Sequence, residues 1–275
     1  MSAAISREDG QSGLENIATA FSRASGTQKA ALMPYYTLGY PDAETSLDIV
    51  EAIAPFSDLV ELGVPFSDPI ADGPTIQRST QRALEAGITT SICLDMVSEL
   101  RSRGVKVPFL MMGYYNPVLA FGEDRYAAAL SDAGADGLIV PDLPPEESGN
   151  LRKRCRESGV ALINFLAPTS NEKRIKLVIE GASGFIYMVS VTGVTGARRR
   201  MSSELSKFVS SIKSQTDIPV AVGFGISTPE QASSIGEYAD GVIVGSALIN
   251  VVDSAEEKPA TAAGFVAKLQ EALKL

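Results

Sequence analysis

Short apolar runs alternate with longer amphipathic stretches along almost the whole chain, and this alternation limits the possible folds more than any other feature. Most of the short runs are continuously apolar, as expected for parallel strands that are covered on both faces. Eight runs are typical of strands: 31–37, 59–62, 108–112, 137–140, 161–165, 184–188, 220–222 and 241–244. Helix-like stretches separate them: 43–54, 75–86, 90–103, 125–133, 146–157, 172–180, 203–214, 229–236 and 265–273.

Eight such strands, spread over about 250 residues with helices between them, predict a single (β/α)8 TIM barrel. We assign residues 29–275 to the barrel and residues 1–28 to an N-terminal extension with a helix. In that helix Leu14, Ile17, Ala18 and Phe21 are expected to share an apolar face that lies across the bottom of the barrel. A doubly wound open sheet is the alternative, but no G-x-G-x-x-G follows the first strand.

The composition narrows the classes of function. The 275 residues are 45% hydrophobic and carry a net charge of -9, which disfavours nucleic acid and anionic membranes as partners. No apolar run approaches the ~20 residues of a membrane span. The chain has no histidine, which excludes a Ser-His-Asp triad and every His-ligated metal site, and we expect no metal. Cys93 and Cys155 lack metal-ligand spacing, and we interpret them as reduced thiols of a cytoplasmic protein.

Residues 59–74, LVELGVPFSDPIADGP, place three carboxylates at the end of the second strand. Glu61 lies within the apolar run, where burial would raise its pKa into the range useful for proton transfer. Asp68 and Asp72 follow in a loop broken by prolines, and acids in different environments can take different roles. The structural alternative is that Asp68 and Asp72 cap turns or the next helix and that Glu61 is exposed.

Glycine-rich turns follow the seventh and eighth strands, at 223–227 and at Gly245. Glycines allow backbone N–H groups to face an anion. Ser227 or Thr228, and Ser246, are each placed to begin a helix, whose N-terminus adds partial positive charge. Because these two loops commonly bind phosphate in barrels, we predict a phosphate site here. The alternative is that the glycines only make tight turns.

Residues 190–200 contain two glycines and end in Arg198–Arg200. We predict a mobile loop that closes over the pocket, and we interpret the arginines as a solvated edge. Several apolar side chains near the strand ends are candidates for an apolar slot that fits a planar ring, although each one singly also fits a core position. These candidates are Tyr35, Tyr114, Tyr187, Phe224, Ile139 and Ile163.

These motifs resemble those of the tryptophan synthase alpha subunit family. The run ELGVPFSDPIADGP at 61–74 is similar to a family signature nearly letter for letter. Further similar blocks follow the family's order: 34–41, 141–144, 189–198, 223–227 and 245–247. The resemblance implies a (β/α)8 barrel and a lyase of tryptophan biosynthesis. The family splits indole-3-glycerol phosphate into indole and glyceraldehyde 3-phosphate by retro-aldol cleavage.

The resemblance also implies roles for individual residues. Glu61 would be the general acid/base, and Asp72 would interact with the indole N–H and stabilise the indolenine-like intermediate. Tyr187 would assist beside Glu61, Tyr35 would pack on the indole ring, and Thr195 would contact Asp72. The remaining implied residues would hold the phosphate: Gly196, Gly225, Gly245 and Ser246.

A beta subunit that uses pyridoxal phosphate is the implied partner, in a heterotetramer of two alpha and two beta subunits, while this chain would carry no cofactor. Val191 departs from the pattern, because some relatives carry Arg there. Three alternatives stay open. The first is a free-standing lyase that releases indole without a partner. The second is an allosteric binding subunit with little chemistry of its own. The third is another phosphate-binding barrel, such as a sugar-phosphate isomerase.

Overall fold

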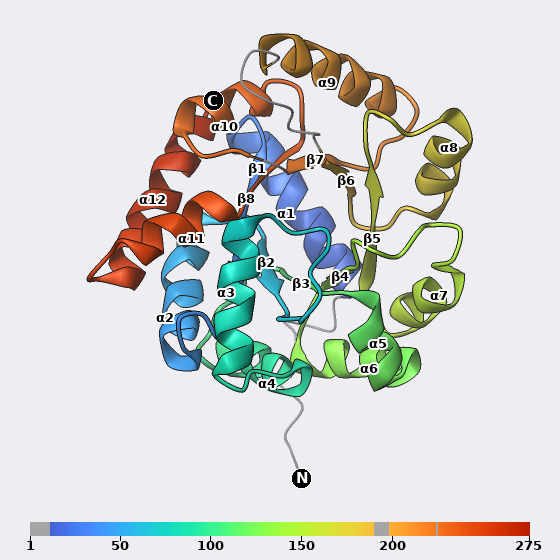
Figure 1. Ribbon diagram of the computed structural model, residues 1–275. Helices are drawn as coiled ribbons and strands as arrows, with labels where there is room; N and C mark the ends of the chain where they lie inside the picture. Colours follow the sequence, from blue (N-terminus) through green and yellow to red (C-terminus); the bar gives the residue numbers. More distant parts are fainter. Residues whose placement is uncertain (1–11, 190–197, 224) are drawn as a thin grey trace.

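A computed structural model of the chain, described over residues 12–189, 198–223 and 225–275, contains a closed barrel of eight parallel strands surrounded by helices (Figure 1). Each strand pairs with the next one along the chain, and β8 (Gly241–Val244) pairs with β1 (Ala31–Thr37). This confirms the predicted (β/α)8 TIM barrel. The open-sheet alternative is wrong, because the pairing of β8 with β1 leaves no edge strand.

The predicted strands lie within two residues of the observed bounds, because each run is apolar throughout and ends at a turn signal. The other strands are β2 (Val60–Gly63), β3 (Phe109–Met112), β4 (Gly137–Ile139), β5 (Ala161–Leu166), β6 (Ile186–Val189) and β7 (Val220–Gly223).

The helices surround the barrel, with α1 at one end. Their bounds are α1 (Gly13–Thr27), α2 (Ala43–Ile53), α3 (Pro74–Glu85), α4 (Thr90–Ser102), α5 (Tyr115–Phe121), α6 (Glu123–Ala133), α7 (Gly149–Glu157), α8 (Glu172–Gly181), α9 (Arg198–Lys213), α10 (Pro229–Gly236), α11 (Ser246–Asp253) and α12 (Lys258–Leu273).

Three helices differ clearly from the prediction. Helix α5 was not predicted; it contains Pro117 in its first turn, where a proline costs no hydrogen bond. Helix α12 begins at Lys258 and not at residue 265, again with a proline in its first turn. Helix α9 begins at Arg198, so Arg198–Arg200 belong to a helix and not to the end of a loop.

Helix α1 closes the N-terminal end of the barrel, as expected. Ile17 and Phe21 belong to the buried cluster formed by the inward-facing residues of the strands. The prediction for Ala18 was wrong, because it is exposed while Ala20 and Ala24 are buried. Helical spacing places Ala20, Phe21 and Ala24 on the face of Ile17 and turns Ala18 away from it. The division of the chain between residues 28 and 29 stays a prediction.

Aspartates one or two residues before three strands hold the lower end of the barrel together. Each one accepts a hydrogen bond from a backbone N–H of the neighbouring strand. The pairs are Asp58 with Leu32 N, Asp136 with Phe109 N and Asp240 with Val220 N, each at 2.9 Å.

Two of these aspartates also bind α1. Asp136 accepts from Asn16 Nδ2 at 2.7 Å, and Asp58 pairs with Arg23 at 3.5 Å and accepts from the side chain of Gln28, the C-cap residue of α1. Asp136 further pairs with Arg101 of α4 at 2.8 Å. The lower end of the barrel is therefore fixed by carboxylates that each accept from more than one donor.

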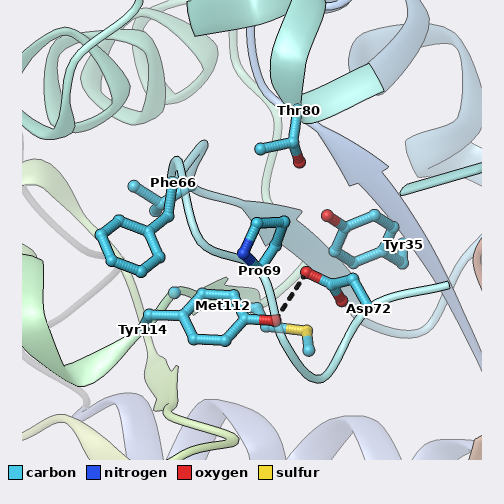
Figure 2. Close-up of a pocket in the computed structure, with 9 residues that line it drawn as sticks. Tyr35, Phe66, Pro69, Asp72, Thr80, Met112 and Tyr114 are labelled. Atoms are coloured by element: carbon cyan, nitrogen blue, oxygen red, sulfur yellow. Dashed lines mark hydrogen bonds between the residues drawn. The ribbon is translucent and has the colours of Figure 1, made fainter. Parts of the chain in front are cut away.

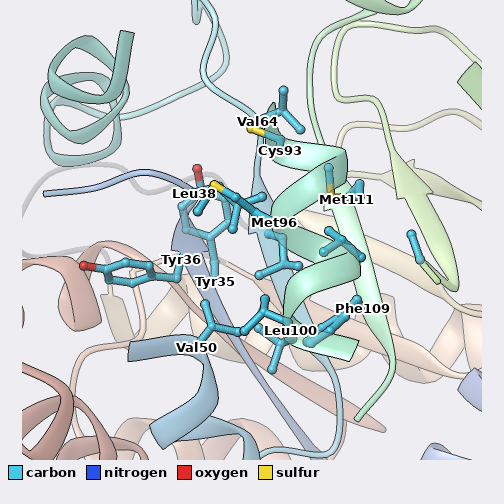
Figure 3. Packing of buried hydrophobic residues seen from close by; sticks show 14 of the residues in the cluster. Tyr35, Tyr36, Leu38, Val50, Val64, Cys93, Met96, Leu100, Phe109 and Met111 are labelled. Carbon is cyan, nitrogen blue, oxygen red and sulfur yellow. The ribbon is translucent and has the colours of Figure 1, made fainter. Parts of the chain in front are cut away.

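An apolar layer fills the space between the strands and the outer helices (Figure 3). Cys93, Met96 and Leu100 of α4 belong to the same buried cluster as Phe109 of β3. Cys155 of α7 is buried as well, and both thiols are free, as interpreted from the sequence. In the described part of the chain, none of the helices has the length and hydropathy needed to span a membrane.

Candidate active site

Glu61 lies on β2 with its side chain inside the barrel. Its neighbours Val60 and Leu62 belong to the outer apolar layer, so strand alternation turns Glu61 inward. The residue is 1% exposed, and among the described residues neither carboxylate oxygen has a hydrogen-bond partner. Burial raises the pKa of Glu61 to about 8. Glu61 therefore holds a proton at neutral pH, and the alternative of an exposed Glu61 is wrong.

Asp72 lies on the loop between β2 and α3, near the end of β3. Its carboxylate accepts a hydrogen bond from the Tyr114 hydroxyl at 2.9 Å (Figure 2). Partial burial raises the pKa of Asp72, and the bond from Tyr114 acts in the opposite direction. Helix α3 has Gly73 as its N-cap and no side-chain cap, so Asp72 does not cap the helix. Asp68, in contrast, is exposed, and its carboxylate accepts from the neighbouring Ser67 hydroxyl.

Tyr35 on β1 pairs in register with Glu61. Burial raises the pKa of Tyr35 well above its ordinary value, and the negative charges of Asp72 and Glu61 raise it further. The hydroxyl fits over Gly63, where a Cβ atom would lie 2.1 Å from it. Tyr35 is thus a neutral aromatic wall beside both carboxylates.

Tyr187 on β6 reaches the same region from the opposite side of the barrel. Burial raises the pKa of Tyr187 far above its ordinary value, with smaller contributions from the charges of Glu61 and Asp72. A Cβ at Gly223 of β7 would lie 2.4 Å from the Tyr187 hydroxyl, so glycine makes room for it. The ring of Phe165 packs against Tyr187 with centroids 4.8 Å apart.

A pocket opens beside Tyr35 and Asp72 at the C-terminal ends of β1, β2 and β3 (Figure 2), and in the described structure Glu61 and Tyr187 do not line it. Its walls combine apolar side chains with polar groups, and among the lining residues Asp72 supplies the carboxylate. The lining residues are Tyr35, Val64, Phe66, Pro69, Asp72, Thr80, Met112, Gly113 and Tyr114.

The predicted anion site lies at the ends of β7 and β8. Gly225 has φ +67, a conformation that favours glycine. Thr228, and not Ser227, caps α10 by accepting from Gln231 N at 3.3 Å. Helix α11 begins at Ser246 after Gly245, without a side-chain cap in the described structure. The N-terminus of α11 is therefore the better placed of the two to receive an anion.

Three of the predicted site residues, Thr195, Gly196 and Phe224, lie outside the described residues. Within the described ranges, no cluster of His, Cys, Asp and Glu side chains is arranged to hold a metal ion.

Comparison with known proteins decides the family. A family model described as tryptophan synthase alpha chain matches residues 21–274. This chain belongs to that family. A tryptophan synthase alpha chain from Chloroflexus aggregans is 46% identical over 94% of this chain and 98% of its own length. One from Roseiflexus sp. (strain RS-1) is 48% identical over 94% of this chain and 100% of its own length.

Solved structures of the family have the same fold. Tryptophan synthase subunit alpha from Legionella pneumophila superposes with a TM-score of 0.86 at 34% identity, covering 94% of this chain and 97% of its own. A chain of Mycobacterium tuberculosis tryptophan synthase superposes with a TM-score of 0.86 at 37% identity, covering 94% and 98%. The resemblance inferred from the motifs is confirmed.

The sequence missed the contact between Tyr114 and Asp72. Tyr114 was predicted only as a wall of the slot, whereas its hydroxyl is a hydrogen-bond partner of the loop. Phe66, Met112 and Thr80 also line the pocket without having been singled out. Met112 carried a usable signal, because it ends a strand whose inward-facing positions are fixed by alternation.

Proposed function

We propose that this chain cleaves indole-3-glycerol phosphate into indole and glyceraldehyde 3-phosphate, with Glu61 as the general acid/base. Family membership supports the reaction, since tryptophan synthase alpha chains are lyases of tryptophan biosynthesis. The observation that carries the role of Glu61 is its complete burial without a described hydrogen-bond partner. An acid whose pKa is near 8 is protonated at neutral pH and ready to give its proton away.

The proton balance of the cleavage can be closed by Glu61 alone. Its carboxyl group first protonates C3 of the indole ring and becomes a carboxylate. The carboxylate then takes the proton of the glycerol hydroxyl next to the ring, and that oxygen forms the aldehyde as the bond to C3 breaks. The hydroxyl proton has replaced the one that went to C3, so Glu61 ends the cycle protonated and no metal or cofactor takes part.

Asp72 is proposed to bind the indole N–H. Protonation at C3 places positive charge on the ring nitrogen, and an ionised carboxylate stabilises that charge. The hydrogen bond from Tyr114 favours the ionised form of Asp72 by lowering its pKa. Tyr35 would pack on the ring, and Tyr187 would lie beside Glu61.

We propose that the phosphate binds at the ends of β7 and β8, through Gly225, Gly245 and Ser246. The support is the positive φ of Gly225 and the uncapped first turn of α11 in the described structure. Thr195 and Gly196 remain part of this proposal, with Thr195 contacting Asp72 and Gly196 contacting the phosphate.

The partner is proposed to be a beta subunit that carries pyridoxal phosphate, in a heterotetramer of two alpha and two beta subunits. Two large apolar side chains support a docking surface near the site. Ile70 on the β2–α3 loop is 82% exposed, and Leu119 on α5, which follows β3, is 53% exposed. Both belong to segments that follow the C-terminal ends of β2 and β3, and we propose that the partner covers them.

The test is to incubate the purified chain with indole-3-glycerol phosphate, with and without a beta subunit, and to assay indole. We expect indole in both arms and faster release with the partner. A high rate that the beta subunit leaves unchanged would favour the free-standing lyase. No indole in either arm would contradict the proposed reaction, and a partner that is nevertheless activated would establish the allosteric alternative.

A further inference from the structure

We propose that Tyr114 is a positioning residue, whose hydroxyl holds the β2–α3 loop so that the Asp72 carboxylate stays in the pocket. The proposal rests on the proposed function, because it assumes that Asp72 takes part in the reaction. Tyr114 follows β3, one strand away from the loop that it contacts.

The Tyr114 hydroxyl uses both of its hydrogen-bonding capacities on this loop. It donates its proton to Asp72 Oδ2 at 2.9 Å and accepts from Ala71 N at 3.0 Å. Its ring also packs against Phe66, near the start of the loop, with centroids 5.3 Å apart. One side chain therefore contacts the loop near both of its ends.

Tyr114 is itself firmly held. It is 4% exposed, and the residues on either side of it are bonded to β4 and to the loop that follows β4. Gly113 N donates to Ile139 O at 3.0 Å, and Tyr115 N donates to Asp142 Oδ1 at 2.9 Å. Three successive loops are thus linked, and Asp142 gains a structural explanation that its sequence motif did not give.

The other hydrogen bonds of the loop leave the Asp72 carboxylate free. One joins the Ser67 hydroxyl to the Asp68 carboxylate, and others involve backbone groups, such as Asp72 N to Pro69 O at 3.0 Å and Gln77 Nε2 to Asp72 O at 2.9 Å. In the part of the chain that the structure describes, Tyr114 is the hydrogen-bond partner of this carboxylate. Without the hydroxyl, Asp72 can rotate away from the pocket.

The same hydrogen bond affects the charge of Asp72. The titratable groups around the carboxylate are Tyr114, Tyr35, Tyr187 and Glu61. Burial raises the pKa of Asp72, and Tyr114 lowers it. Removing the hydroxyl should therefore make Asp72 take up a proton at a higher pH, which weakens its interaction with the charged ring.

The test compares two substitutions at adjacent residues. Tyr114→Phe keeps the ring against Phe66 and removes only the hydroxyl. Tyr115→Phe is the matched control, because it removes a hydroxyl that bonds to a carboxylate over the same distance, Glu123 at 2.9 Å. We expect kcat/KM for indole formation to fall about 10-fold in Tyr114→Phe and to stay within about twofold in Tyr115→Phe.

Two further readouts separate positioning from a general structural role. In Tyr114→Phe the acid limb of the pH profile of kcat/KM should move to higher pH, and in Tyr115→Phe it should not. In an Asp72→Asn background, adding Tyr114→Phe should lower kcat/KM by a further factor of less than about two. The reason is that the group that Tyr114 positions has already been altered. An unshifted acid limb, or the same loss in both backgrounds, overturns the proposal.

Wild-type protein and Glu61→Gln are measured in the same assay. If the wild type forms no indole, or if Glu61→Gln is nearly as active, the proposed function itself fails. If both behave as expected and Tyr114→Phe matches Tyr115→Phe in rate and pH profile, only the positioning role fails. Thermal unfolding of the two phenylalanine variants shows whether both are equally folded.

Discussion

The two ends of the barrel bury carboxylates in opposite circumstances. At the N-terminal end, Asp136 is 1% exposed, and its oxygens accept from Asn16, Arg101 and Phe109 N at 2.7 to 2.9 Å. At the C-terminal end, Glu61 is equally buried, yet its oxygens have no partner among the described residues. Both acids lie in or directly before an apolar strand.

The difference shows that burial alone does not define the role of an acid. A buried carboxylate with several donors ties elements together, because each donor replaces a hydrogen bond to water. A buried carboxyl without donors costs stability but keeps its proton, which suits proton transfer. The barrel is therefore stabilised at one end and strained at the end where the reaction is proposed.

The largest expected effect is the loss of activity in Glu61→Gln. If activity were kept, the contrast between the buried acids at the two ends of the barrel would not hold. Glutamine has the size of glutamic acid but neither gives nor takes the proton, so indole formation should fall about 1,000-fold. The measurement is indole release from indole-3-glycerol phosphate by protein whose circular dichroism spectrum is unchanged. Near-normal turnover would reject Glu61 as the acid/base.

The matched substitution at the other end, Asp136→Asn, should act on stability and not on catalysis. An amide loses the charge that pairs with Arg101 and cannot serve all three donors, so the free energy of unfolding should fall by about 3 kcal/mol. Urea unfolding measures this loss. Indole formation per folded molecule should stay within about twofold of wild type, and a large loss there would contradict the division of roles between the two ends.

A smaller expected effect concerns how the stability of the protein depends on pH. The pKa of Glu61 rises from an ordinary 4.5 to about 8 on folding, so between these values only the native state holds the proton. The contribution of the Glu61 proton to the free energy of unfolding is fully present below about pH 4.5, and it is lost as pH rises toward 8. Glu61→Gln removes this dependence, and near pH 8 the variant should exceed the wild type by roughly 2 kcal/mol.

That comparison is made by urea unfolding of both proteins at about pH 5 and pH 8, values near the two ends of the window expected for this buried acid. The difference in free energy of unfolding between Glu61→Gln and the wild type should widen as pH rises. A gap that is the same at both values would mean that Glu61 is not strained by its burial.

Much of the barrel was predictable, because parallel strands covered on both faces must be apolar throughout, and the chain contains eight such runs between turn signals. Helix boundaries were less predictable. Prolines in the first turns of α5 and α12 resemble breaks in the sequence, and only the position of each proline within its helix makes it tolerable.

For the site, the sequence placed Glu61 within a strand and Asp72 on the loop that follows, and alternation then decided which way Glu61 points. It also identified Tyr35 and Tyr187 as side chains of the same rim. It gave no sign that Tyr114 bonds to Asp72, because the two residues are 42 positions apart and belong to different loops.

The sequence by itself therefore determined the type of fold, the family and the kinds of side chain at the strand ends, since these depend on local patterns and on motif identity. Only the tertiary structure decided which acid is paired and which is not. The protonation of a carboxyl depends on the atoms within a few ångströms of it, and closure of the barrel brings those atoms from strands that are distant in the chain. Asp136 meets Asn16 from 120 positions away, whereas Glu61 meets apolar walls and keeps its proton.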